Sequence, residues 1–178
     1  MRLPIDVSAA PSSGAEVTAF AVEDAEELCA ALAHEQVWAH IPGPQPRTPT
    51  ELLAIFAGDA ATRQVLVVRA HGGVVGTSSY FLDPTDPQGV EIGATLYTPS
   101  EWGSGVNTVV KAAMLGAAFD AGAQWVQFRT DERNGRSAAA ILKLPGAVER
   151  SPLLEPDKIR KDGSVRTSRL FRIPRPVQ

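Results

Sequence analysis

The sequence predicts a single-domain α/β protein in which helices cover both faces of a mixed β-sheet. Hydrophobic residues recur with a period of two in some segments and with a helical period in others. Short polar turns join the strands in the first half of the chain, which forces neighbouring strands to pair antiparallel. One long helical pattern separates the strands expected at 90–98 and 125–130, and such a crossover joins parallel neighbours. A mostly antiparallel sheet with one parallel pair is therefore expected.

The first residues differ in composition from the rest of the chain. Residues 1–15 are rich in Pro, Ser and Ala, which predicts a flexible leader. Residues 16–178 show no internal repeat and no linker-like stretch, so they are expected to form one domain. The chain of 178 residues is long enough for one hydrophobic core.

Two helices are expected between the first and second strands. Asp24 with Glu27 resembles an N-cap pair, and that helix is expected to continue to about His34. A proline-rich loop at 35–47 follows. The second helix begins at Thr48-Pro49-Thr50-Glu51, which combines a capping box with proline at the first helical position.

The remaining elements follow from periodicity and turn signals. Helices are expected at 106–121, ended by Gly122, and from Asn134 to the stop at Pro145-Gly146. The expected order is β-α-α-β-β-β-α-β-α-β-β, with strands at 17–22, 64–70, 74–82, 90–98, 125–130, 147–150 and 165–173.

Composition and charge exclude several classes of function. The net charge of −3 gives no general attraction to nucleic acid or to an anionic membrane. Cys29 is the only cysteine, so an intrachain disulfide and a cysteine-based zinc site are both excluded. The three histidines form no metal-ligand motif, and no metal is expected. No apolar run could span a bilayer and no secretory signal opens the chain, so the cytoplasm is the expected compartment.

A turn with two glycines lies between the strand at 90–98 and the helix at 106–121. There, Gly103-Ser104-Gly105 directs main-chain N–H groups and the positive end of a helix dipole into one space, which suits a phosphate group. A dinucleotide fingerprint would need a third glycine where Thr108 stands, and the Gly-Lys-Ser/Thr ending of a Walker loop is absent. By itself, a lone Gly-Ser-Gly is more often a plain turn than a ligand-binding loop.

The surrounding motifs resemble those of the GNAT superfamily of N-acetyltransferases. The order of the motifs is a strand, the loop Pro-x-x-x-Gly-x-Gly, a helix and a second strand. This order is followed by the pattern Thr130-Asp131-x-x-Asn134-x-x-Ser137-x-x-Ala140-Ile141-x-x-Leu144. The narrower resemblance is to the branch that acetylates the N-terminal residue of ribosomal proteins. It extends from about Val17 to Ile173 and is strongest between Val90 and Leu144.

The resemblance implies a fold, a cofactor and a set of contacts. The parallel strands at 90–98 and 125–130 are expected to splay apart, and acetyl-CoA is expected to enter the gap as co-substrate. Backbone groups near the strand's end would hold the pantetheine arm: Ala94, Thr95 and Leu96. N–H groups of the loop would hold the pyrophosphate: Trp102, Gly103, Ser104, Gly105, Val106 and Asn107. Asn134 and Ser137 would lie beside the arm, near the sulfur.

Amine acetylation also requires proton transfer. An amine attacks a thioester only when neutral, and a free α-amino group has a pKa near ~8 and a lysine near ~10.4. Glu91, on the strand beside the expected gap, is the candidate proton acceptor. The alternative is a strand glutamate held in a salt bridge, because the alternation of side chains along a strand does not show which face is exposed to solvent.

The leaving thiolate needs a proton or a hydrogen bond. Many superfamily members use a tyrosine there, but none follows Arg133, so the resemblance implies Ser137. A serine hydroxyl is too weak an acid to act alone, which leaves hydrogen bonding or a relay from water. A packed helix position is the alternative for Ser137. Trp38 and His40 are candidates for the acceptor pocket, with a core position for Trp38 and a surface position for His40 as alternatives.

The sequence therefore predicts an N-acetyltransferase that transfers acetyl from acetyl-CoA by direct attack in a ternary complex. The acceptor would be a protein N-terminus or a small-molecule amine, with no nucleic acid, no membrane and a monomeric or homodimeric chain. A catalytically inactive acyl-CoA-binding sensor or partner protein is the alternative from another class. A structural domain that kept the fold without the ligand is a third.

Overall fold

A computed structural model describes residues 1–7, 14–58 and 60–176. The strands are β1 (Ala15–Ala19), β2 (Arg63–Ala70), β3 (Gly73–Phe81), β4 (Gly89–Tyr97), β5 (Trp125–Asp131), β6 (Val148–Ile159) and β7 (Val165–Pro174). The helices are α1 (Ala25–Ala31), α2 (Pro49–Ala57), α3 (Val106–Asp120) and α4 (Gly135–Leu142). Short 3₁₀ turns occupy Val22–Asp24, Glu35–Trp38 and Pro99–Glu101.

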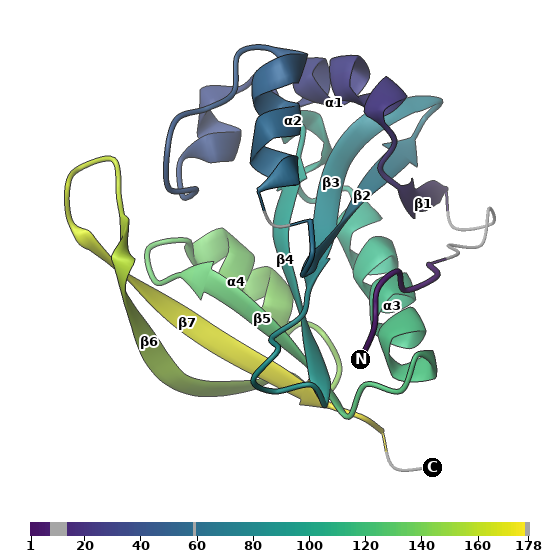
Figure 1. The fold of residues 1–178 in the computed structure, drawn as a ribbon, viewed down its shortest axis with the longest axis vertical. Coiled ribbons are helices and arrows are strands. Elements are labelled where there is room, and N and C mark those ends of the chain that lie inside the picture. Colours follow the sequence, from purple (N-terminus) through teal and green to yellow (C-terminus); the bar gives the residue numbers. More distant parts are fainter. Residues whose placement is uncertain (8–13, 59, 177–178) are drawn as a thin grey trace.

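The described strands form one mixed sheet. Its order is β1-β2-β3-β4-β5-β7-β6, and every neighbouring pair is antiparallel except β4 with β5. The parallel pair covers only 89–91 against 125–127, after which the two strands separate. Figure 1 shows the result as two arms of the sheet, β1 to β4 and β5 with β7 and β6. The predicted α/β class, element order and parallel pair are confirmed.

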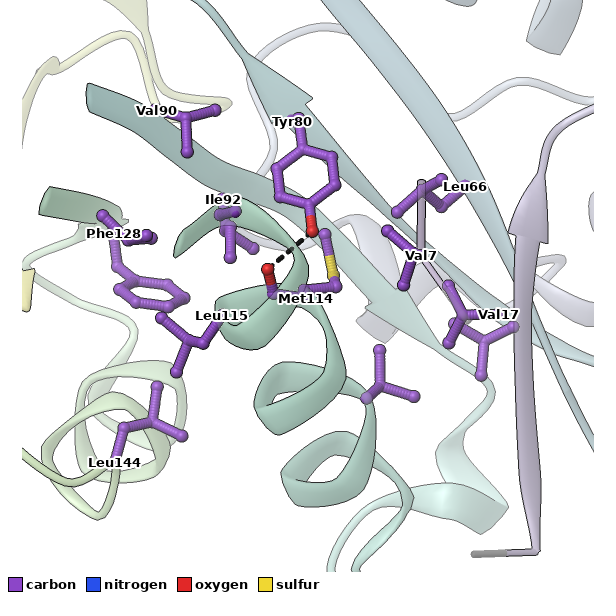
Figure 2. Packing of buried hydrophobic residues seen from close by; sticks show 14 of the residues in the cluster. Val7, Val17, Leu66, Tyr80, Val90, Ile92, Met114, Leu115, Phe128 and Leu144 are labelled. Atoms are coloured by element: carbon purple, nitrogen blue, oxygen red, sulfur yellow. Dashed lines mark hydrogen bonds between the residues drawn. The ribbon is translucent and has the colours of Figure 1, made fainter. Parts of the chain in front are cut away.

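Each face of the sheet has its own hydrophobic core. On one face α3 and α4 pack against a cluster that includes Val90, Ile92 and Phe128. Figure 2 shows this cluster, in which the Tyr80 hydroxyl donates a 2.6 Å hydrogen bond to the Met114 carbonyl of α3. The other face carries a smaller cluster, which packs against the arm formed by β1 to β4. Helices α1 and α2 and the turn at 35–38 all contribute to it. The sheet therefore separates a side with α3 and α4 from a side with α1 and α2.

A bulge in β4 determines which side chains face α3. Ala94 has a positive φ of 46°, and the β3–β4 register slips between Thr77 and Ser79. One surplus residue reverses the alternation of the strand beyond it. Thr95 therefore faces α3, whereas Leu96 joins the core under α1 and α2.

Helix starts agree with their predicted caps in two cases and differ in one. The Thr48 hydroxyl accepts from the Glu51 N–H, and the Asn134 side chain accepts from the Ser137 N–H. Asp24 makes no side-chain cap of α1. Its carboxylate instead accepts from the Ala21 N–H, so a 3₁₀ turn precedes a helix that is shorter than predicted.

The largest correction to the expected elements concerns β6. The sequence predicts a strand only at 147–150, but β6 continues to Ile159 despite Pro152 and Pro156. Proline lacks an N–H, and an edge strand needs only half of its main-chain groups for pairing. β6 is the edge beside β7, and its register shifts between Arg150 and Leu153 and again before Ile159.

Part of the expected leader packs against the sheet. The Gln64 side chain forms hydrogen bonds of 2.7 and 2.9 Å with the main chain of Ile5, which is buried together with Val7. Residues 8–13 of the leader lie outside the described residues. Strand β1 begins at Ala15 rather than at the expected residue 17.

Candidate active site

A cleft opens where β4 and β5 stop pairing. It encloses about 700 Å³ and is lined by both strands, the loop before α3, the first turns of α3, and α4. The last paired residues, Glu91 and Gln127, lie at its base. The splay predicted for these strands thus provides a cavity large enough for a long, thin ligand.

The loop before α3 presents unpaired main-chain donors. Gly103 and Gly105 have positive φ angles of 87° and 96°, which favour glycine, and Gly105 is the N-cap of the 15-residue helix α3. The Ser104 and Val106 N–H groups bond within the loop. In the described part of the chain, the N–H groups of Gly103, Gly105 and Asn107 have no hydrogen-bond partner. The helix dipole and these three donors together suit an anion.

Side chains around this loop reinforce the anion site. Asn107 Oδ1 is buried without a partner in the described residues, and a flipped amide would offer a donor at the same place. The Trp102 indole donates to the Tyr97 carbonyl at 3.1 Å. The Arg136 guanidinium covers the Trp102 ring, and no described carboxylate forms an ion pair with it. An unneutralised cation therefore lies beside the free N–H groups.

Glu91 faces the side of the sheet opposite α3. Its Oε2 accepts hydrogen bonds from Gln127 Nε2 at 3.0 Å and from Arg129 Nε and Nη2 at 3.2 and 2.8 Å. The salt bridge considered as the alternative for Glu91 is therefore present. It does not remove Glu91 from the cleft, because the carboxylate lines the cavity and its Oε1 accepts none of these bonds.

A second carboxylate continues this charged network. Glu155 of β6 accepts hydrogen bonds from Arg129, Lys158 and Ser168, and it also pairs with Arg166. Burial by itself would raise the pKa of Glu155, but these donors lower that pKa to about 2. The network fixes Arg129, and through it the orientation of the Glu91 carboxylate.

Comparison with known families identifies the fold. The family model described as an acetyltransferase (GNAT) domain matches residues 16–145, which is more than half of the chain. The chain belongs to the GNAT acetyltransferase family. No curated protein matches the sequence.

Solved structures of GNAT proteins share the fold at low sequence identity. A probable GNAT acetyltransferase from Chromobacterium violaceum is 21% identical, with 90% of this chain and 87% of that chain covered and a TM-score of 0.79. Mycobacterium smegmatis RimJ in complex with CoA-disulfide is 18% identical, with 90% and 81% covered and a TM-score of 0.75. The ribosomal-protein-S5-alanine acetyltransferase from Vibrio fischeri is 15% identical, with 91% and 93% covered and a TM-score of 0.73.

The residues predicted from the GNAT resemblance converge on the cleft in large part. Those that line it are Glu91, Ala94, Thr95, Leu96, Trp102, Gly103, Asn107, Asn134 and Ser137. Ser104, Gly105 and Val106 belong to the same loop but do not line the cavity. Asn134 uses its Oδ1 to cap α4 by accepting a hydrogen bond from the Ser137 N–H, and this contact fixes the main chain at Ser137.

The two residues predicted for the acceptor pocket have different surroundings. Trp38 is buried in the core under α1 and α2, where its Nε1 donates to the Leu32 carbonyl at 2.8 Å, and it does not line the cleft. The core alternative therefore describes Trp38. His40 does line the cleft, and burial lowers the pKa of its imidazole.

Sequence reasoning did not single out Lys111, which also lines the cleft. It lies on the sheet-facing side of α3, 5% exposed, one turn after Asn107 and three residues before the core residue Met114. Burial lowers the pKa of Lys111 to about 7. The signal for it was a lysine at a position where the helical period of α3 requires an apolar side chain.

Other kinds of site are not indicated in the described ranges. There, no three His, Cys, Asp or Glu side chains gather as metal ligands. Among the same residues no helix combines the length and apolar character needed to cross a membrane.

Proposed function

We propose that this GNAT protein transfers the acetyl group of acetyl-CoA directly to a primary amine, with donor and acceptor bound together in the cleft. The acceptor class is a protein N-terminus or a small-molecule amine. The strongest support is that one cavity offers hydrogen-bond donors for an anion at one end and a carboxylate for an amine at the other. Free N–H groups of Gly103 and Asn107 lie at one end, with that of Gly105 on the same loop, and the Glu91 carboxylate lies at the other.

The first end suits the diphosphate of coenzyme A. Three unpaired N–H groups at the start of α3, with the cation of Arg136 nearby, match the charge and donor needs of a diphosphate. The exposed main chain of Ala94 to Leu96, next to the bulge, offers hydrogen-bonding groups for the amides of the pantetheine arm. The residues present therefore fit this co-substrate.

The second end suits an amine. The Glu91 carboxylate attracts an ammonium group, and its Oε1 is available to accept a proton, directly or through water. The neutral nitrogen then bonds to the thioester carbonyl carbon, and the carbon–sulfur bond breaks with its electron pair on sulfur. Ser137, on α4, is proposed to donate a hydrogen bond to that sulfur.

Binding of the co-substrate is tested by thermal unfolding. Acetyl-CoA at about a hundred times its Kd stabilises the native state by about 2.7 kcal/mol. For a chain of this size the midpoint should rise by roughly 5–10 °C. No rise at any concentration would exclude both acetyl transfer and an acyl-CoA sensor, and would favour a domain that has lost its ligand.

Catalysis is tested by thiol release with a panel of amines that includes peptides with free N-termini and small diamines. Release with at least one amine separates an enzyme from an inactive sensor. The Glu91→Gln variant keeps the shape of the side chain and removes its basicity, so kcat should fall by roughly 10²–10⁴-fold. The Glu149→Gln variant, on the exposed face of β6, is the matched control. An unchanged kcat in Glu91→Gln would show that another group accepts the proton.

A further inference from the structure

Among the residues that the structure describes, Lys111 is a buried amine without a carboxylate partner. Its Nζ donates hydrogen bonds to Ser78 Oγ at 2.9 Å and to Thr95 Oγ1 at 2.6 Å, and it lies 5.7 Å from the centre of the Phe128 ring. Within the described residues, no carboxylate lies within 4 Å of Nζ. A methionine or leucine would fill this space without the cost of burying a charge. A buried lysine at this position therefore indicates that its amino group has a chemical role.

The bulge at Ala94 creates the polar environment of Lys111. Without the surplus residue, regular alternation would place Thr95 on the opposite face of β4. With it, the Thr95 hydroxyl faces α3 and completes a triangle with Lys111 Nζ and Ser78 Oγ, whose oxygen is 2.8 Å from Thr95 Oγ1. The bulge thus helps to hold this amine at the wall of the cleft.

The sheet places Lys111 and Glu91 on opposite sides of the cleft. Glu91 bonds to Gln127 and Arg129, which alternate along β5 with the α3-facing residues Val126 and Phe128. Lys111 is on the α3 side, together with the free N–H groups that head the same helix. An amine at Glu91 would therefore approach the cleft from the side opposite Lys111.

From this arrangement we propose that Lys111 is the acid that protonates the departing thiolate of coenzyme A. The inference rests on the proposed acetyl transfer. As the carbon–nitrogen bond forms, the carbon–sulfur bond breaks with its electron pair on sulfur. Lys111 gives one N–H proton to that sulfur and becomes a neutral amine. Solvent restores its proton through the Thr95 hydroxyl, and the proton lost by the acceptor leaves through Glu91.

The chemistry of the two groups is well matched. An unperturbed thiol has a pKa near ~8.5, and the pKa of Lys111 is about 7, so proton transfer from Lys111 to a thiolate is favourable. A serine hydroxyl is a far weaker acid, which restricts Ser137 to hydrogen bonding. Tyrosine, the usual acid of the superfamily at the start of α4, is absent from this chain after Arg133.

Few other titrating groups surround Lys111. Burial alone lowers its pKa, with no contribution from a neighbouring charge. β5 contributes the uncharged Phe128 and Thr130 on this side, and burial raises the pKa of both nearby phenols, so they stay neutral. The titratable or charged side chains on the α3 side include Tyr80 of β3, Tyr97 of β4, Glu101 of the preceding loop and Arg136 of α4. Elsewhere, the cleft is also lined by His40, Asp83, Asp86, Glu91, Arg129, Asp131, Lys158, Arg166 and Arg172.

The test measures the thiol of bound coenzyme A by its ultraviolet absorbance as thiolate. A permanent cation within about 4–6 Å lowers a thiol pKa by roughly 1–3 units. Lys111 loses its own proton near pH 7, so the lowering that it causes should be smaller, at the bottom of that range. Wild-type protein saturated with CoA should therefore show a lower thiol pKa than free CoA. The Lys111→Met variant should bind CoA yet leave its thiol pKa near the free value. Lys143→Met, which removes an exposed lysine just after α4, should behave as wild type.

Kinetics and mass measurement complete the test. In Lys111→Met we expect kcat to fall roughly 10²-fold or more with KM for the amine little changed, and the alkaline limb of the pH profile to disappear. Equal thiol pKa values in wild type and Lys111→Met, with CoA bound to both, would overturn the proposal and leave acetyl transfer standing. So would acetylation of Lys111 itself by acetyl-CoA, seen as a mass increase on its peptide. Wild-type protein that binds no CoA would overturn both proposals together. If Lys111→Met does not fold, the wild-type protein decides the question by itself. A thiol pKa of bound CoA equal to that of free CoA would then contradict the acid role of Lys111.

Discussion

The guanidinium of Arg136 lies over the indole ring of Trp102, with 3.4 Å between Cζ and the ring centroid. This contact joins the first turn of α4 to the loop before α3. Stacking fixes the plane of the guanidinium and leaves its N–H groups available at the edge. An anion held by the loop would therefore meet a positioned cation at the mouth of the cleft.

The Arg136→Leu substitution is expected to weaken coenzyme A binding. A hydrogen bond to a charged group contributes about 1.5–3 kcal/mol, so Kd should rise by roughly tenfold or more. Titration calorimetry at two salt concentrations measures this, and the wild-type advantage should shrink as salt screens the charge. Arg133→Leu is the control, because Arg133 is already paired with Asp162 in the structure. Equal losses in the two variants would count against a specific contact from Arg136.

Two glycines with the same backbone conformation allow the cost of backbone strain to be measured separately from a loss of ligand binding. Gly105 and Gly122 have φ angles of 96° and 98°, and no atom lies within 4 Å of a Cβ built on either. Alanine at either position should destabilise the fold by about 1–2 kcal/mol, because L-residues disfavour this region. Only Gly105→Ala should weaken coenzyme A binding, since Gly122 lies at the far end of α3. Normal affinity in Gly105→Ala would place the phosphates elsewhere.

The start of the β4–β5 pair has no room for a side chain at Gly89. A Cβ there would lie 2.2 Å from the ring of Trp125, whose other contacts include Arg172 stacked at 3.7 Å. Gly89→Ala should destabilise the protein by about 1–3 kcal/mol through overpacking. Thermal unfolding should show the loss, together with a change in tryptophan fluorescence. Gly116→Ala, in open space on α3, should instead stabilise by about 0.5–1 kcal/mol.

The Glu155 network predicts a loss of stability in acid. The pKa of this carboxyl is about 2 in the folded protein against an ordinary 4.5, so its contribution is complete above about pH 4.5. It disappears as the pH falls towards 2, because protonation then favours the unfolded chain. Glu155→Gln should cost about 3 kcal/mol at pH 7, and the difference from wild type should vanish on acidification. Denaturant unfolding from pH 7 to 2.5 checks this, with a pH-independent difference as the contrary outcome.

Local signals sufficed to predict most of the fold. Short turns fixed the antiparallel order of β2, β3 and β4, and the long helical period before β5 predicted the parallel crossover. The caps at Thr48 and Asn134 are also local. β6 was underestimated because Pro152 and Pro156 normally end a strand, and its place at the edge of the sheet depends on the order of distant strands.

The candidate site was predictable only where its residues lie in one segment. The loop at 102–107 is continuous in sequence, and its motif indicated an anion site. The partners of Lys111 are Ser78 and Thr95, 33 and 16 residues away, and no local pattern connects them. The same holds for Glu91, whose salt bridge with Arg129 spans two strands. Trp38 has a polar edge and an apolar body, and sequence alone did not decide between pocket and core.

The bulge at Ala94 makes the surroundings of Lys111 depend on a single surplus residue. A deletion of that residue would restore a regular ladder between β3 and β4 and turn Thr95 away from α3. Lys111 would then keep only Ser78 of the two hydroxyl groups that accept its hydrogen bonds. A redesign that removed the irregularity from β4 to gain stability would therefore also change the polar wall of the cleft.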